Sequence, residues 1–150
     1  MRALVMILAA MVLAGCSHAA RSDPASAPTS QPATAPASLA GTKWNLLELN
    51  GKPARRGEND TVVAWLEFDA KTNRVGGNGS INHFGGTYTL NGHSIEFSDM
   101  MSTMMAGPEP LMNQESALMK VLEDAKSWRT RDGKLELLAG DNVLARFEKR

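Results

Sequence analysis

The sequence predicts an α+β domain in which short antiparallel strands curl into a barrel-like sheet packed with one main α-helix. Three observations lead to this fold class. Beyond residue 39, polar and apolar residues alternate over short runs, which is typical of half-buried strands. Pairs such as Asn50-Gly51 separate several of these runs and favour tight hairpin turns. One segment, about residues 109–126, instead repeats its apolar residues with a helical period.

The predicted strands are short and follow one another closely, as in antiparallel sheets and barrels. They cover residues 42–49, 61–68, 87–90, 93–97, 127–130, 134–138 and 142–147. Besides Asn50-Gly51, we expect tight turns at Asn91-Gly92 and Asp132-Gly133. Trp44, Trp65 and Trp128 lie within such runs, and we interpret them as core or rim packing residues.

The helical segment begins with Pro108 and Pro110, which the first turn of a helix tolerates and its interior does not. Its apolar positions are Leu111, Leu118, Val121, Leu122 and Ala125. This spacing puts them on one face. We therefore expect a single helix that packs against the sheet.

Residues 1–15 have the pattern of a secretory signal peptide. Arg2 precedes an apolar run that is too short to span a bilayer comfortably, and small residues lead to Cys16, the only cysteine. Leu13-Ala-Gly-Cys16 resembles the bacterial lipobox, which implies an S-diacylglycerol and an N-acyl chain on Cys16. Several acyl chains would anchor the protein stably. An ordinary signal peptide with an incidental cysteine stays an alternative.

Residues 16–38 are predicted to be a lipidated N-terminus followed by a linker. From Ser17 they are almost entirely Ala, Ser, Thr and Pro, a composition that buries too little apolar surface to fold and favours an extended spacer. One folded domain, 39–150, follows. By resemblance to enterobacterial lipoproteins, Ser17 after the cysteine predicts the outer membrane, facing the periplasm.

The charge balance bears on the possible partners. The chain has 16 basic and 16 acidic side chains, whereas nucleic-acid binding usually needs a basic patch. No local nucleophile motif accompanies His83 or His93. His83 could serve as a base or ligand, but a loop-capping role is the simpler interpretation, and we interpret His93 as a solvated hairpin residue. We therefore expect a monomeric domain without nucleic-acid binding, catalytic residues, a metal site or a cofactor.

Two unusual stretches invite chemical interpretations. The glycine-rich stretch 76–88 lacks the last glycine of a dinucleotide motif and has no helix after it, which argues against phosphate binding. We interpret its glycines as serving backbone geometry at a bulge or corner. Met100–Met105 could offer thioethers to Cu(I), although methionine also forms adaptable apolar surfaces. We expect the glycine corner and segment 100–112 to be adjacent.

Several motifs, taken in order, resemble the META domain family, which includes HslJ-like bacterial lipoproteins. The resemblance covers roughly residues 39–149. The matching positions are Trp44, Asn50, Gly51, Gly77, Asn82, Phe84, Gly86, Tyr88, Thr103, Met105 and Glu115.

The resemblance implies a compact, sheet-rich α+β domain with no established enzymatic activity or cofactor. Many relatives have cysteines where this chain has Ile81 and Gly107, and arginines where it has His83 and Met104. The joint absence of both cysteines is expected if they pair in those relatives. Any family role of the arginines does not carry over to this chain.

These observations predict a lipid-anchored, non-enzymatic protein of the bacterial cell envelope. The expected partners are the membrane, through Cys16, and another envelope protein. The resemblance to the META domain family implies a role in envelope stress tolerance or in pilot-like interactions. The main alternative is a binder of a small apolar or lipidic ligand within the sheet, and an envelope hydrolase is a more distant one.

Overall fold

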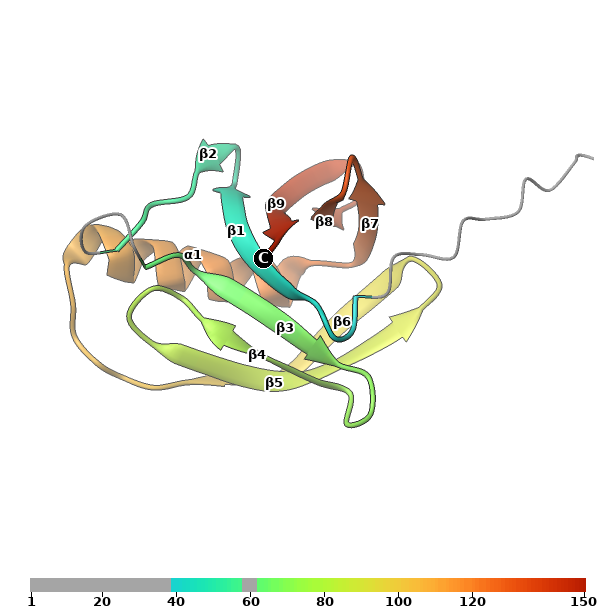
Figure 1. Cartoon of the computed structure of the whole chain (residues 1–150), viewed down its shortest axis with the longest axis horizontal. Helices are drawn as coiled ribbons and strands as arrows, with labels where there is room; N and C mark the ends of the chain where they lie inside the picture. Colours follow the sequence, from blue (N-terminus) through green and yellow to red (C-terminus); the bar gives the residue numbers. More distant parts are fainter. Residues whose placement is uncertain (1–38, 58–61) are drawn as a thin grey trace, which may run out of the picture. The chain divides into compact units, whose positions relative to one another are not determined.

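The computed structural model describes residues 39–57 and 62–150. Within these ranges the chain forms nine strands and one helix (Figure 1). The elements are β1 (Lys43–Leu49), β2 (Lys52–Pro53), β3 (Trp65–Asp69), β4 (Arg74–Asn78), β5 (His83–Asn91), β6 (Ser94–Ser102), α1 (Glu109–Asp124), β7 (Ser127–Arg131), β8 (Lys134–Ala139) and β9 (Asn142–Lys149). The predicted signal peptide, Cys16 and the linker lie outside the described residues.

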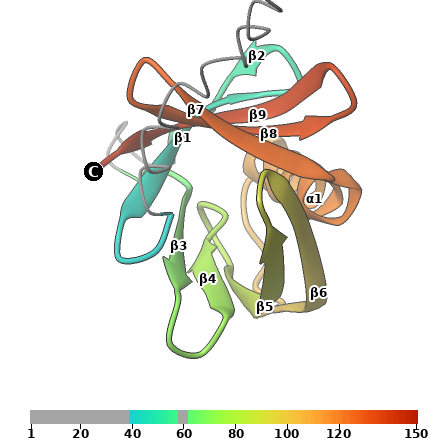
Figure 2. The same ribbon diagram turned by 90° about the vertical axis from the view of Figure 1, so that its right-hand side faces the viewer.

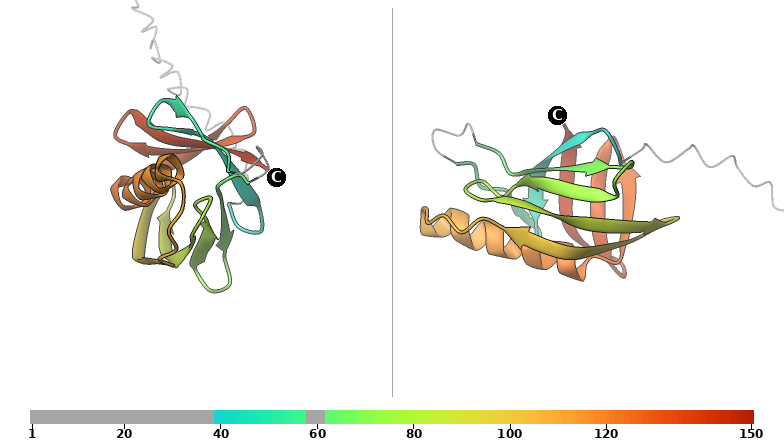
Figure 3. Two further views of the ribbon diagram at one scale, coloured as in Figure 1. Left: turned by 90° about the vertical axis from the view of Figure 1, so that its left-hand side faces the viewer. Right: turned by 90° about the horizontal axis from the view of Figure 1, so that it is seen from below.

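The strands form one antiparallel sheet in the order β2-β1-β3-β4-β5-β6-β7-β8-β9. Because β1 pairs with both β3 and β9, this sheet closes into a ring. β6 and β7 pair only at Ser94 and Ser127, and Figures 2 and 3 show α1 beside the ring where these two strands separate. A mainly antiparallel sheet with one helix confirms the predicted α+β class.

Alternate side chains of the strands point into the ring and form its core. Trp44, Phe68 and Phe147 are among its largest fully buried side chains. The rings of Phe68 and Tyr88 meet edge to face with their centroids 5.0 Å apart, a favourable arrangement for aromatic pairs. The apolar face of α1 adds buried residues to this core, namely Leu111, Leu118, Val121 and Leu122.

Two of the predicted turns are confirmed by their backbone angles. Asn50 and Gly51 have φ values of 49° and 74°, and Asp132 and Gly133 have 52° and 73°. Positive φ at both central residues defines the mirror-image turn that suits twisted hairpins. These turns connect β1 to β2 and β7 to β8.

The third turn is shifted by one residue from the prediction. Asn91 pairs with Ser94 inside the sheet, so the loop consists of Gly92 and His93. Gly92 takes the positive φ of 59°, which glycine adopts without steric cost. A positive φ at the first loop residue needs glycine there, and this requirement sets the register of the hairpin.

Several predicted boundaries also need correction; the strand expected at 61–68, for example, is β3 and runs only from Trp65 to Asp69. α1 ends at Asp124 rather than at residue 126, because Ala125 is already extended and the Lys126 N–H donates to the Leu138 carbonyl. Most of the glycine-rich stretch lies within β4 and β5. The pairing of β5 with β6 shifts its register between Gly85 and Thr87, and residues 79–82 turn the chain from β4 into β5, which confirms the expected bulge and corner. In the described part of the chain, no helix is long and apolar enough to cross a membrane.

Candidate functional site

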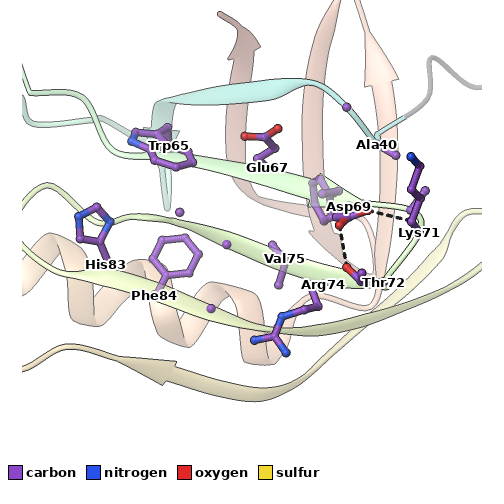
Figure 4. A pocket seen from close by; sticks show the side chains of 16 residues that line it. Ala40, Trp65, Glu67, Asp69, Lys71, Thr72, Arg74, Val75, His83 and Phe84 are labelled. Carbon is purple, nitrogen blue, oxygen red and sulfur yellow. Dashed lines mark hydrogen bonds between the residues drawn. The ribbon is translucent and has the colours of Figure 1, made fainter.

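A pocket of about 780 Å³ lies on the outer face of β3, β4 and β5 (Figure 4). Gly76 and Gly85 are cross-strand partners on this face and form its floor. These two glycines belong to a row of cross-strand partners, in which Glu67 of β3 pairs with Gly76 and Met101 of β6 pairs with Gly85. The centre of this row therefore exposes backbone without side chains.

Larger side chains stand on both sides of this floor. Trp65 of β3 and His83 of β5 both pair with Asn78 of β4, so they belong to the next row. On the opposite side, Arg74 pairs with Asp69, and Figure 4 shows both near the β3–β4 turn. We refer to the surface made by these side chains and the floor as the glycine face, defined by Trp65, Glu67, Arg74, Gly76, His83 and Gly85.

The fold itself does not require glycine at the floor positions. A Cβ added to Gly76 or Gly85 would lie 3.7 or 3.6 Å from its nearest neighbour, a backbone oxygen, which is ordinary contact. Gly77 differs, because its added Cβ would overlap the Trp65 carbonyl oxygen and lie 2.5 Å from the Phe84 ring. Gly77 thus serves packing, whereas Gly76 and Gly85 leave the outer surface open.

Several polar groups around the floor have no partner among the described residues. Among the described residues, the side chains of Glu67, Arg74 and His83 make no hydrogen bond or ion pair, and the Trp65 indole N–H donates to no acceptor. The Lys43 ammonium lies 3.7 Å from the centroid of the Trp65 ring, a cation–π contact. The free donors and acceptors of this face are therefore available to a ligand.

Asp69 also lines the pocket, but its side chain is paired. Its carboxylate accepts hydrogen bonds from the Thr72 hydroxyl and the Lys71 backbone N–H, each at 2.8 Å (Figure 4). These bonds hold the pKa of Asp69 below its ordinary value of 3.8 because they favour the ionised form. Asp69 therefore stabilises the β3–β4 turn at the edge of the pocket.

Four residues of the family motif meet at a second site, which we refer to as the corner clamp. One oxygen of Glu115 accepts the backbone N–H groups of Ile81 and Asn82 at 2.7 and 2.5 Å, and the other accepts the Asn82 amide at 2.8 Å. The Asn82 side-chain oxygen accepts the Thr103 hydroxyl at 2.9 Å and the Met105 N–H at 2.7 Å. Glu115 and Asn82 are buried. The clamp therefore joins three chain segments and has no group free for a ligand.

The corner clamp confirms that the glycine corner and the methionine segment are adjacent. Met105 is held by its backbone, while its side chain is 54 % exposed and that of Met104 is 97 % exposed. A Cβ added to Gly107 would overlap the side chain of Ile81. The two positions where relatives have cysteines are therefore neighbours here, as expected of a pair.

The remaining motif residues serve the fold. Trp44, Phe84 and Tyr88 are buried in the core. A Cβ at Gly86 would lie 2.7 Å from the Ser98 carbonyl oxygen, so this glycine permits close packing of β5 and β6. The Asn50-Gly51 turn does not line the pocket.

Sequence reasoning missed the roles of Glu67, Arg74, Gly76 and Gly85. The alternation in Trp65–Asp69 does indicate that Trp65 and Glu67 share a face. Their place beside Gly76 of β4 and Gly85 of β5 depends on the register of separate strands, which local sequence does not determine. In the described ranges, no group of three His, Cys, Asp or Glu side chains is close enough to hold a metal ion.

Solved structures with a similar fold come from distant sequences. An NMR structure of a protein from Burkholderia xenovorans has a TM-score of 0.61 at 19% identity, covering 75% of this chain and 83% of that one. A crystal structure of a DUF4847 family protein from Bacteroides vulgatus has a TM-score of 0.51 at 13% identity, covering 73% of this chain and 93% of that one. At such identities the likeness shows the fold alone.

Sequence comparison identifies the family. No curated protein matches the chain, but the model of the META domain matches residues 37–150. This range includes the ring, the helix, the corner clamp and the glycine face. The chain belongs to the META domain family.

Proposed function

We propose that this chain is a lipid-anchored, non-enzymatic protein of the bacterial cell envelope, on the outer membrane facing the periplasm. Its META domain acts there in envelope stress tolerance by binding another envelope component through the glycine face. The lipobox-like Leu13–Cys16 and the linker support the anchor. The observation that carries the binding role is a set of polar side chains, without a partner in residues 39–57 and 62–150, around a bare backbone floor.

The outer face is a better candidate than the interior of the sheet. Bulky side chains such as Trp44 and Phe147 fill the ring, and the void beside Glu115 holds only about 20 Å³. Ligand sites usually offer roughly 300–1,000 Å³. A small apolar ligand inside the ring would have to displace core residues, so the packing disfavours this alternative.

The anchor is tested with Cys16→Ala, using Ser17→Ala as the matched control. Removing the thiol removes the attachment point of the acyl chains, so Cys16→Ala should leave the membrane fraction while Ser17→Ala stays. In a deletion strain, Ser17→Ala but not Cys16→Ala should restore tolerance to detergent stress. Membrane retention of Cys16→Ala equal to that of the wild type would refute the lipid anchor.

The binding role is tested by site-specific photo-crosslinking in intact cells. A photoreactive residue replaces His83 on the glycine face or, as a control, Arg129 on the outer face of β7. Position 83 should give a discrete adduct with an envelope component, and position 129 should give none. Equal labelling from both positions, or no adduct from position 83, would contradict a role for the glycine face.

A further inference from the structure

We propose that the glycine face binds a neutral glycan, with a sugar ring stacked on Trp65 and its hydroxyl groups bonded to Glu67, Arg74 and His83. This inference rests on the proposed binding role of the glycine face and adds the chemical class of the ligand. Three features support this inference, namely Trp65, the balance of the charges that line the pocket, and the glycine floor of the pocket.

Trp65 differs from the other two tryptophans. The indole N–H of Trp44 donates to the Leu39 carbonyl at 3.3 Å, and that of Trp128 donates to the Gly92 carbonyl at 3.2 Å, and both rings are buried. Trp65 lies half-buried on the outer face with its N–H unpaired among the described residues. The Lys43 ammonium lies against this ring, and the rest of the half-buried indole offers an apolar surface next to a polar donor. A sugar ring has the matching combination of C–H faces and hydroxyl edges.

The charges lining the pocket balance. Glu67 and Asp69 oppose Lys71 and Arg74, while Lys43 lies outside the lining against the Trp65 ring. An anionic ligand in the pocket would therefore meet two carboxylates, and a cationic ligand would meet two cations. Carboxylates accept hydrogen bonds, and guanidinium groups donate several in a fixed plane. Free acceptors and donors around a pocket without net charge favour a neutral ligand with many hydroxyl groups.

The floor favours a flat ring over an extended peptide. With glycine at positions 76 and 85, a ligand can approach the backbone closely, and about 780 Å³ is within the usual range for small-molecule sites. β3, β4 and β5 each pair on both sides, so a peptide cannot add as a strand. Grooves for proline-rich peptides are lined by aromatic side chains, whereas Trp65 is the only outward tryptophan here.

The test follows the three indole N–H signals of the ¹⁵N-labelled full chain by NMR. Chitotriose and maltotriose are the glycan probes, and inorganic phosphate and a proline-rich decapeptide are the comparators. At least one glycan should shift the Trp65 signal while those of Trp44 and Trp128 stay in place. Gly85→Val, which fills the floor, should weaken binding by about tenfold or more, since one lost aromatic contact alone approaches that factor. The control Arg129→Gln, on another face, should bind like the wild type.

Each outcome of this test decides the inference. It is overturned if neither glycan moves the Trp65 signal at about 10 mM, a concentration that would nearly saturate a site with a Kd of about 1 mM. It is also overturned if Gly85→Val binds as well as the wild type, or if phosphate or the peptide moves Trp65 and the glycans do not. In the last case, crosslinking from position 83 would still support the proposed function, so the two failures are distinguishable.

Discussion

The outer surface of the ring has two faces that differ in how their charged side chains are paired. On β7, β8, β9 and β1, Glu136 accepts a hydrogen bond from Arg129 at 2.6 Å and from Arg146 at 2.8 Å. Arg146 also reaches Glu48 at 2.8 Å. These four residues are cross-strand neighbours and form a paired charge ladder. On the glycine face, Glu67 and Arg74 have no such partners among the described residues.

The difference shows which charges serve the fold. Glu136 is only 4 % exposed; its burial raises its pKa, but the hydrogen bonds from Arg146 and Arg129 outweigh this effect and lower the pKa below the ordinary 4.5. A carboxylate with a lowered pKa stabilises the folded state. Glu67, Arg74 and His83 on the glycine face are exposed and gain nothing comparable from the fold, so we assign them to binding.

The largest expected effect distinguishes Gly77, which packs against the core, from its neighbour Gly76 in the floor of the glycine face. Gly77→Ala should lower the free energy of unfolding by about 3 kcal/mol, because the new methyl group overlaps backbone of β3. The neighbouring Gly76→Ala should be neutral or stabilising by about 0.5 kcal/mol. Urea unfolding of both variants measures the difference, and equal losses would show that both glycines serve packing.

The corner clamp should give the next largest effect. Asn82→Ala removes both the acceptor of the Met105 N–H and a donor to Glu115, which should cost about 2 kcal/mol because buried groups lose their partners. Asn142→Ala, an exposed asparagine at the start of β9, should change the free energy of unfolding by less than about 0.5 kcal/mol. Thermal unfolding compares the two, and an Asn82→Ala variant as stable as Asn142→Ala would contradict the clamp.

The smallest expected effect comes from comparing Glu136 of the paired charge ladder with Glu67 of the glycine face. Glu136→Gln should cost about 1 kcal/mol at pH 7, because its arginine partners are partly exposed. Since the folded-state pKa of Glu136 is lowered, this contribution is complete above the ordinary value of 4.5 and is lost as the pH falls through the folded-state pKa. Glu67→Gln should have no measurable cost at pH 7, because the carboxylate is exposed and has no ion-pair partner among the described residues. A stability gap between wild type and Glu136→Gln that stays constant down to pH 2 would argue against the ladder.

Local patterns in the sequence predicted much of the fold. The alternation around Trp44, the turn at Asn50-Gly51 and the helical period after Pro110 depend on neighbouring residues, and the structure confirms all three. The family resemblance supplied the corner clamp residues but not their contacts. The glycine face depends on the register of three strands, and a shift by one residue would turn Trp65 and Gly76 inward. Its role was therefore not predictable from local sequence.

The central claim is that Gly76 and Gly85 keep the glycine face open for binding and are not needed by the fold. Crosslinking from position 83 in cells that carry Gly85→Val tests it most directly, with the melting temperature of the same variant as a control. We predict an unchanged melting temperature, because the added side chain meets only ordinary contacts at its Cβ, together with loss of the adduct. An adduct formed as efficiently as in the chain with Gly85 would contradict the claim.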